Sequence, residues 1–154
     1  MRTDGQRRVL VLIGAGSAVF TRGLLADLIS ATDLAEWDIR LVDVAEAPLA
    51  TAFGLARNMI RSRNAAEQIS VSATVDRRTA LPGADFVVTC VGVGGRPAWQ
   101  TDHEVCLRPE VFSRAGDSVM PGGISRLMRT TPVLVEIAAD VAELAPQALF
   151  FNYS

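Results

Sequence analysis

Two hydrophobic patterns alternate along the chain. Short apolar runs rich in β-branched residues predict buried strands, and apolar positions at helical spacing predict helices with one covered face. Strands are expected at residues 9–13, 38–43, 69–73, 84–91 and 148–152. Helices are expected from the end of the first strand to Ile29, over 46–62 and over about 123–144. We expect Pro132 to kink the last helix or to divide it in two.

This alternation predicts an α/β fold, because parallel strands are joined by helices that cover both faces of their sheet. We expect a Rossmann-like, doubly wound sheet with three layers (α/β/α), strand order 3-2-1-4-5, and one domain over residues 1–154. Ser154 follows the fifth strand directly, where a doubly wound sheet continues into another crossover. The chain is therefore expected to be the first half of a longer protein, with the C-terminal half missing.

A glycine-rich turn joins the first strand to the first helix. Gly14 and Gly16 match the first two positions of the fingerprint Gly-x-Gly-x-x-Gly, whereas Val19 stands at the third. The first two glycines allow backbone N–H groups to approach a pyrophosphate at the helix N-terminus. Because the third glycine serves close packing, we expect this helix to lie slightly further from the sheet. A purely structural turn remains an alternative.

Residues at the ends of the second and fourth strands strengthen the dinucleotide hypothesis. Asp43 ends the second strand, where its carboxylate can accept hydrogen bonds from the adenosine ribose and repel a 2′-phosphate, which favours NAD over NADP. Gly92 and the pair Gly94-Gly95 would let the backbone pass beside the dinucleotide. The alternative for Asp43 is an ordinary aspartate that caps the next turn.

The composition is that of an ordinary globular protein, with 49% hydrophobic and 21% charged residues in 154. A net charge of −2 gives no basic footprint, which argues against a nucleic-acid partner. No apolar run reaches the roughly 18–20 residues that span a bilayer, and the polar N-terminus does not resemble a signal peptide. Cys90 and Cys106 are expected to be reduced thiols of a cytoplasmic protein.

The second half of the chain carries more specific motifs. They are Gly94-Gly95, Asp102-His-Glu-Val-Cys-Leu107, Gly116-Asp117, Pro121-Gly-Gly-Ile124, Arg126-x-x-Arg129-Thr-x-Pro132 and Asn152-Tyr-Ser154. With the opening Ile13-Gly-Ala-Gly-Ser-x-x-Phe-Thr21, they resemble the NAD-dependent glycoside hydrolases of family 4 over nearly the whole chain. The segment from Glu104 is most similar to α-galactosidase-type members. Trp99 stands where members that act on phospho-sugars tend to carry Arg, which favours an unphosphorylated sugar.

The resemblance implies a glycosidase that depends on NAD and on a divalent metal, usually Mn²⁺. In that mechanism NAD⁺ takes a hydride from C3 of the sugar, the aglycone leaves by elimination, water adds, and the hydride returns. The metal stabilises the enediolate formed after oxidation. The resemblance also places the family's metal ligands and its base beyond Ser154. The isolated chain is therefore expected to bind cofactor but to hydrolyse nothing.

The resemblance also assigns roles to individual residues. The cofactor site is expected to contain Gly14, Gly16, Ser17, Phe20, Asp43, Gly92 and Asn152. The amide of Asn152 can donate to a sugar hydroxyl beside the nicotinamide, so Asn152 is expected to bind substrate as well, and Arg126 is a second substrate-binding candidate. A simple turn former is the alternative for Asn152. The whole enzyme is expected to act on α-galactosides as a homodimer or higher homo-oligomer.

Several reactive side chains are expected to be structural. His103 and Cys106 provide too few ligands for a metal, so no metal site is expected in this chain. Asp102, Glu104 and Asp117 are not expected to form a catalytic pair, and Trp37 and Trp99 are expected to pack rather than to stack on sugar. For Arg126 and Arg129, contacts with substrate oxygens, acidic partners, Asp117 or another subunit remain open.

Two other functions share the expected fold. A lactate/malate-type dehydrogenase half would carry substrate arginines after the fourth strand, where Arg96 and Arg108 lie. A stand-alone NAD-sensing module would bind the dinucleotide without any chemistry. The Pro121-Gly-Gly-Ile124 block fits the dehydrogenases poorly, which favours the glycosidase hypothesis.

Overall fold

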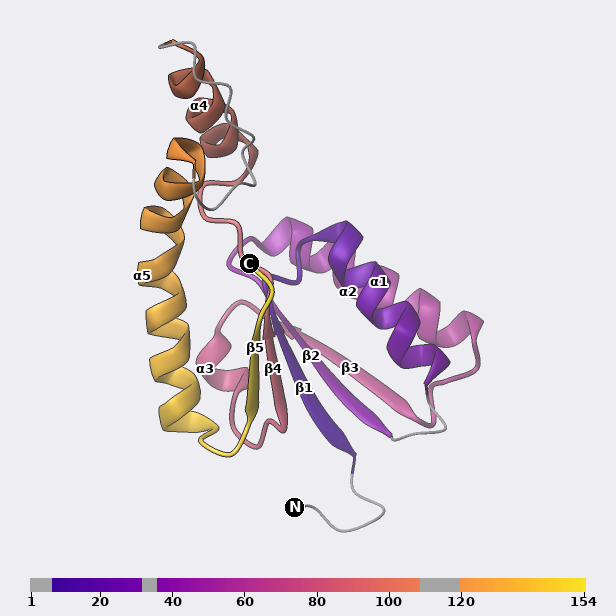
Figure 1. The fold of residues 1–154 in the computed structure, drawn as a ribbon. Helices are drawn as coiled ribbons and strands as arrows, with labels where there is room; N and C mark the ends of the chain where they lie inside the picture. The colour runs from indigo at the N-terminus through magenta and orange to yellow at the C-terminus, as the bar shows by residue number, and fades with distance from the viewer. Residues whose placement is uncertain (1–6, 32–35, 109–119) are drawn as a thin grey trace. The chain divides into compact units, whose positions relative to one another are not determined.

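The computed structural model describes residues 7–31, 36–108 and 120–154. The elements, in chain order, are β1 (Arg8–Ile13), α1 (Ala18–Ser30), β2 (Trp37–Val42), α2 (Glu46–Ser62), β3 (Ile69–Thr74), α3 (Arg77–Ala80), β4 (Phe86–Thr89), α4 (Gly95–Leu107), α5 (Pro121–Leu144) and β5 (Leu149–Asn152). Figure 1 shows them as a ribbon. The chain divides into two compact units: a sheet unit, Met1–Cys90 with Asp140–Ser154, and a helical unit, Val91–Ala139.

The sheet unit contains a five-stranded sheet in the order β3-β2-β1-β4-β5, and every pairing is parallel. This confirms the predicted fold class and strand order. The register aligns Ile13 of β1 with Val42 and with Thr89, and Thr89 with Asn152 of β5. The carboxyl ends of four strands therefore meet at one edge of the sheet, which is where ligands bind in this type of fold.

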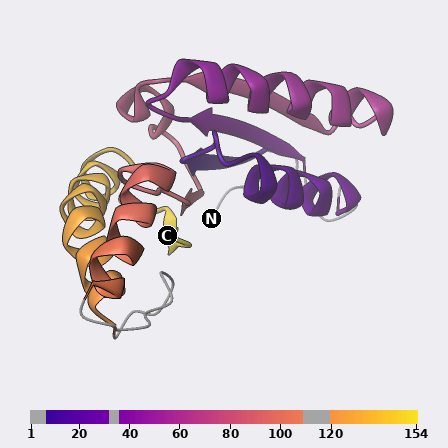
Figure 2. The same cartoon turned by 90° about the horizontal axis from the view of Figure 1, so that it is seen from above.

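The order of strands also fixes the faces that the helices cover. The crossovers β1-α1-β2 and β2-α2-β3 step in the same direction, so right-handed connections put α1 and α2 on one face. They lie side by side there (Figures 1 and 2). The crossover through α3 steps the other way and places α3 on the opposite face. Arg77 and Arg78 of α3 form ion pairs with Asp140, at the end of α5.

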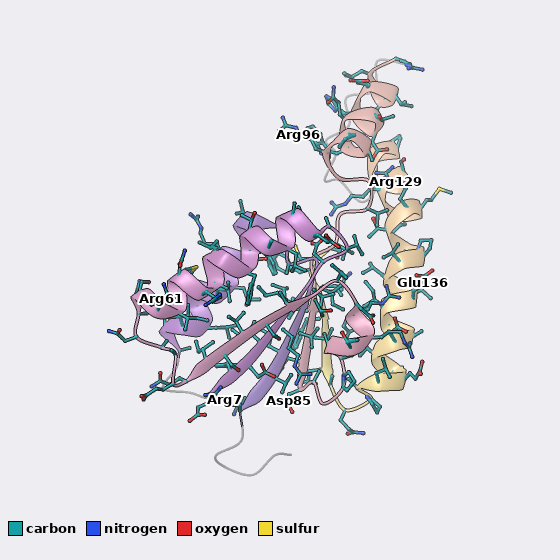
Figure 3. All side chains as sticks on the ribbon, turned by 180° about the vertical axis from the view of Figure 1, so that it is seen from behind. Arg7, Arg61, Asp85, Arg96, Arg129 and Glu136 are labelled. Carbon is teal, nitrogen blue, oxygen red and sulfur yellow. The ribbon has the colours of Figure 1, made fainter. Side chains whose placement is uncertain are left out.

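The core is centred on β1, whose residues Val11 and Leu12 are fully buried. A strand covered on both faces needs a continuous apolar run, as the sequence of β1 provides. The predicted inward residues of β2, Leu41 and Val42, are also buried. At the amino end of the sheet, the carboxylate of Asp85 accepts a hydrogen bond from the N–H of Val9 at 2.8 Å (Figure 3).

Two expectations for the helices concern Val19 and Pro132. The side chain of Val19 is 79% exposed, and the wider separation of α1 from the sheet stays a prediction. The helix α5 continues through Pro132 from Pro121 to Leu144, so the proline does not divide it. Among the described residues, no helix is both long and apolar enough to cross a bilayer.

The helical unit begins with an element that the sequence did not predict. Helix α4 starts after Gly94, which has a φ of +80°, and only Asp102 and Cys106 of the helix are buried. With few apolar residues at helical spacing, and with Gly95 and Pro97 at its start, this segment has the composition of a loop. The short helix α3 was missed because one helical turn is too short for a periodic signal.

Candidate functional site

The turn after β1 is held from both sides. Gly14 has a φ of +91°, and the N–H groups of Gly14 and Ala15 donate to the carbonyl of Val42 at 2.8 and 3.0 Å. From α1, the fully buried hydroxyl of Thr21 donates to the carbonyl of Ala15 at 2.7 Å. Hydrogen bonds from two sides therefore hold the turn, and the contact of Thr21 was not predicted, although Thr21 closes the opening motif.

Gly16 occupies a position that has no room for a side chain. A Cβ built there would lie 2.7 Å from Oδ2 of Asp43 and 2.8 Å from the Cβ of Pro48. Real Cβ atoms do not approach other atoms so closely, so the glycine is required by close approach. The close approach is to Asp43 and Pro48, so the role of Gly16 at a pyrophosphate stays a prediction.

Asp43 lies against this turn and also caps the next turn, which leads into α2. Its Oδ2 accepts a hydrogen bond from the N–H of Gly16 at 2.8 Å, and its Oδ1 accepts one from the N–H of Ala45, the N-cap of α2, at 2.9 Å. The capping alternative is therefore correct, but it does not exclude a ligand. Each carboxylate oxygen has two lone pairs, so the side chain retains acceptor capacity for hydroxyl groups.

The N-terminus of α1 follows the glycine turn. Ser17 is its N-cap, and its side chain makes no capping hydrogen bond with the described residues. The first turn of the helix contains no acidic residue. The first N–H groups of a helix have no intrahelical partner, and the dipole places a partial positive charge there. This helix end is therefore suited to an anion such as a pyrophosphate.

The ends of β4 and β5 complete the edge of the sheet. The buried hydroxyl of Thr89 lies 2.9 Å from Oδ1 of Asn152, and the same oxygen accepts the N–H of Ser154 at 3.1 Å. The ring of Tyr153 contacts the ring of Phe20, with centroids 4.6 Å apart. Predicted site residues from α1 and β5 thus lie at the edge that carries the glycine turn.

Asp43 and five other predicted cofactor residues therefore belong to one edge region of the sheet unit. The five are Gly14, Gly16, Ser17, Phe20 and Asn152. The remaining candidates, Gly92 and Arg126, belong to the helical unit. A Cβ at Gly92 would meet nothing within 4 Å, and the side chain of Arg126 is exposed. Their assignment to the site stays a prediction.

The helical unit contains a partly buried ion pair, in which Arg129 contacts an acidic partner, Asp102. Its Nη1 and Nη2 donate to Oδ1 and Oδ2 of Asp102 at 2.8 and 2.6 Å, and the hydroxyl of Ser125 donates to Oδ1 at 2.7 Å. Arg129 is labelled in Figure 3. The hydrogen bonds from Arg129 hold the pKa of Asp102 below its ordinary value. An acidic partner was one of the alternatives left open for Arg129, although Asp102 was not named as that partner, and Asp117 lies outside the described residues.

Other reactive side chains of α4 have structural contacts. The ring of His103 stacks on Trp99, with centroids 6.1 Å apart and planes 10° apart, and Cys106 is buried. Within residues 7–31, 36–108 and 120–154, no group of three or more His, Cys, Asp or Glu residues is arranged to hold a metal ion. In the sheet unit, Trp37 packs against Phe86 with ring centroids 5.8 Å apart.

The parallel sheet, the glycine turn and the acidic residue after β2 define a Rossmann-like domain of the class that binds dinucleotides. Residues 9–154 match the family 4 glycosyl hydrolases, and the chain belongs to that family. It corresponds to the N-terminal, NAD-binding region of the family. Membership favours the glycosidase hypothesis over the dehydrogenase alternative.

Curated relatives show how much of a family member the chain represents. It is 38% identical over 146 residues to an alpha-glucosidase of Erwinia rhapontici, covering 94% of this chain and 32% of the relative. It is 35% identical over 146 residues to an alpha-galactosidase of Rhizobium meliloti, covering 94% of this chain and 29% of the relative. The chain thus spans about a third of the length of these relatives, rather than the expected half.

A solved structure confirms the fold. The crystal structure of a 6-phospho-alpha-glucosidase from gut microorganisms, in complex with NAD and Mn²⁺, superimposes with a TM-score of 0.87 at 19% identity. The match covers 97% of this chain and 33% of that protein. At this identity the likeness establishes the architecture and leaves the sugar open.

Proposed function

We propose that this chain is the NAD-binding region of a longer glycosidase that hydrolyses O-glycosidic bonds by oxidation at C3 of the sugar, elimination and re-addition of water. The observation that carries the proposal is the contact between Gly16 and Asp43. At this contact, Gly16 has no room for a side chain, and Asp43 retains acceptor capacity. The start of α1 lies next to it, where the side chain of Ser17 makes no capping hydrogen bond with the described residues. Family membership supports the glycosidase chemistry.

The residues present fit a dinucleotide. Gly14, Gly16 and Ser17 would hold the pyrophosphate, because the turn exposes backbone and the end of α1 attracts negative charge. Asp43 would accept hydrogen bonds from the adenosine ribose, and its charge would repel the extra phosphate of NADP. When bound, NAD supplies the site with a group that takes a hydride from the sugar and returns it in the same turnover.

The side chains at the ends of α1 and β5 orient the other half of the ligand. Phe20 and Tyr153 offer an aromatic surface beside the turn, and Tyr153 is 69% exposed. The amide of Asn152 donates to a hydroxyl oxygen near the sheet edge. These residues bind and align, whereas proton transfer is assigned to parts of the enzyme outside this chain.

For the substrate, we propose an unphosphorylated α-galactoside. The support is the likeness of the segment from Glu104 to α-galactosidase-type members and the presence of Trp99 where Arg is typical of phospho-sugar members. An α-glucoside is the second candidate, because the chain has similar identity to an alpha-glucosidase and to an alpha-galactosidase. Arg126 remains a proposed substrate contact. The whole enzyme is proposed to require Mn²⁺ and to work in the cytoplasm as a homodimer or larger homo-oligomer.

Two experiments test these proposals at different levels. Isothermal titration calorimetry of the 154-residue chain should show binding of NAD⁺ and much weaker binding of NADP⁺. For the longer protein, nitrophenyl α-galactoside, α-glucoside and their 6-phosphates should be compared with and without NAD⁺ and Mn²⁺. Hydrolysis of the α-galactoside only when both are present is the expected result. Turnover without metal, or by the isolated chain, would contradict the proposed chemistry.

A further inference from the structure

The side-chain amide of Asn152 has a defined orientation at the sheet edge. A backbone N–H can only donate, so the Asn152 atom that lies 3.1 Å from the N–H of Ser154 must be the acceptor Oδ1. The hydroxyl of Thr89 lies 2.9 Å from the same oxygen. Two donors therefore meet Oδ1, and the Nδ2 end of the amide is the end that is turned away from Thr89.

Thr89 is well placed to hold this orientation. It is fully buried at the end of β4, paired in register with Ile13 on one side and with Asn152 on the other. Its β-branched side chain has few rotamers in a strand, so the direction of its hydroxyl is restricted. The other acceptor near this hydroxyl, the carbonyl of Phe151, is more distant at 3.5 Å.

Without the Thr89 hydroxyl, the amide would lose the shorter of the two hydrogen bonds that hold Oδ1 and would keep only the one from the N–H of Ser154. The terminal torsion of Asn is broad and roughly two-fold, so an unconstrained amide presents either its oxygen or its nitrogen. Asn152 is exposed, and water can satisfy either end. The N–H of Ser154 can only donate, so it selects Oδ1 as the atom that faces Thr89, and the shorter contact with Thr89 holds the amide in that orientation. Nδ2, a donor of two hydrogen bonds, is then left to face a ligand.

We propose that Thr89 is a positioning residue, which holds the amide of Asn152 so that its N–H groups donate to a ribose hydroxyl of the bound dinucleotide. This inference rests on the proposed NAD-binding function. In this proposal Thr89 influences cofactor affinity through Asn152, without a contact of its own with the ligand. The sequence alone showed Thr89 only as a polar interruption of an apolar strand.

Three substitutions separate the hydroxyl, the amide and the fold. Thr89→Val removes the hydroxyl while keeping the shape, and Thr89→Ser keeps the hydroxyl. Asn152→Asp retains an acceptor for Thr89 but has no N–H to donate. Each variant of the 154-residue chain is titrated with NAD⁺ by calorimetry, and its thermal unfolding is recorded. The side-chain amide signals of Asn152 are followed by NMR without ligand.

We expect Thr89→Val to weaken NAD⁺ binding roughly threefold to tenfold, the loss of about one net hydrogen bond. Thr89→Ser should restore affinity to within about twofold of the parent chain, and Asn152→Asp should bind at least as weakly as Thr89→Val. In the NMR spectrum, Thr89→Val should shift or broaden the Asn152 amide signals, whereas Thr89→Ser should leave them near their original positions. Rescue by Ser distinguishes positioning from a general effect on folding.

The contrary outcomes are equally distinct. Unchanged affinity in Thr89→Val, beside a clear loss in Asn152→Asp, would overturn the role of Thr89. Unchanged affinity in Asn152→Asp would overturn the donor role of the amide. If the parent chain fails to bind NAD⁺, the proposed function is wrong, and the NMR comparison alone then decides whether Thr89 orients Asn152.

Discussion

Two glycine-rich turns follow strands in this chain, and they are built differently. The first, Gly14–Ser17, lies in the sheet unit between β1 and α1, and the second, Gly92–Gly95, lies in the helical unit before α4. The first is crowded: a Cβ at Gly16 would collide with Asp43 and Pro48. The second is open at Gly92, where a Cβ would meet nothing within 4 Å.

The second turn owes its shape to backbone conformation and to one ion pair. Gly94 and Gly95 have φ values of +80° and +55°, which favour glycine. A Cβ at Gly94 would lie 2.5 Å from the Cβ of Ala98 and 3.7 Å from Nε of Arg129, so the Arg129 guanidinium lies close to the turn. Asp102 and Ser125 hold that guanidinium in place.

The difference teaches that a glycine can be required for two separate reasons. In the first turn, the requirement comes from a neighbouring strand and helix, and it leaves backbone and an acid available to a ligand. In the second turn, Gly94 combines a left-handed conformation at the start of α4 with a close approach to the Cβ of Ala98. We therefore expect substitutions in the first turn to affect cofactor binding most, and substitutions around the second to affect the local stability of the helical unit.

The largest effect is expected for Gly16→Val. The new side chain must displace Asp43 and Pro48 and would cover the surface proposed for the pyrophosphate. NAD⁺ affinity should fall roughly 100-fold or more, equivalent to ~2.7 kcal/mol. Gly23→Ala on α1 is the control, because nothing lies within 4 Å of its Cβ position, and it should bind NAD⁺ normally. If calorimetry finds that both variants bind NAD⁺ with the affinity of the parent chain, the first turn is not part of the cofactor site.

A smaller effect is expected for Asp43→Asn. The amide keeps the shape of the carboxylate but lacks its charge. The N–H groups of Gly16 and Ala45 now donate to the two carboxylate oxygens, so in the variant one of them would face the amide nitrogen, which is also a donor. NAD⁺ affinity should fall about tenfold, and the preference for NAD⁺ over NADP⁺ should narrow. Parallel titrations with both dinucleotides measure this. A preference that survives unchanged would mean that Asp43 only caps the turn that leads into α2.

Gly92→Ala sharpens the comparison further. Because the position is open in the protein itself, the substitution should leave the melting temperature nearly unchanged. A drop in NAD⁺ affinity of about twofold to fivefold would then indicate a contact between Gly92 and the ligand rather than strain in the protein. Affinity equal to that of the parent chain would remove Gly92 from the cofactor site.

For the helical unit, Asp102→Asn should destabilise α4 against α5. The variant leaves Arg129 without its anionic partner, because Asp102 accepts from both of its terminal nitrogens. The melting temperature should fall by several degrees, with ~2–8 °C for each kcal/mol lost. Glu104→Gln is the control on the same helix, since Glu104 is exposed and accepts only from Gln100 among the described contacts. Equal melting temperatures would show that the ion pair does not stabilise the unit.

The last prediction concerns the dependence of folding stability on pH, which two carboxylates with lowered pKa values should set in acid. Hydrogen bonds from Arg129 lower the pKa of Asp102, and those from Arg77, then Arg78, lower the pKa of Asp140, each from an ordinary 3.8. The unfolded chain therefore binds more protons, so stability is present above pH 3.8 and is lost as the pH falls through the lower native values. Denaturant titrations between neutral and strongly acid pH measure this loss. Asp102→Asn and Asp140→Asn should each flatten the dependence, and a profile unaltered by both would contradict the shifts.

The comparison also shows what sequence could and could not predict. The strands followed from apolar runs such as that of β1, and their order followed from the alternation of strands and helices in a doubly wound fold. Helix α4 was missed, because it has few apolar residues at helical spacing, and its buried Asp102 contacts Arg129, 27 positions away in sequence. The glycines and Asp43 were located by their positions at strand ends. Their hydrogen bond, and the contact of Thr89 with Asn152, depend on the register between strands, which no local pattern encodes.

The most direct test is a crystal structure of the 154-residue chain grown with NAD⁺. We expect a pyrophosphate bound by N–H groups at the start of α1, and adenosine ribose hydroxyls within hydrogen-bond distance of the Asp43 carboxylate. A dinucleotide bound elsewhere, or a ribose that makes no contact with Asp43, would contradict this expectation.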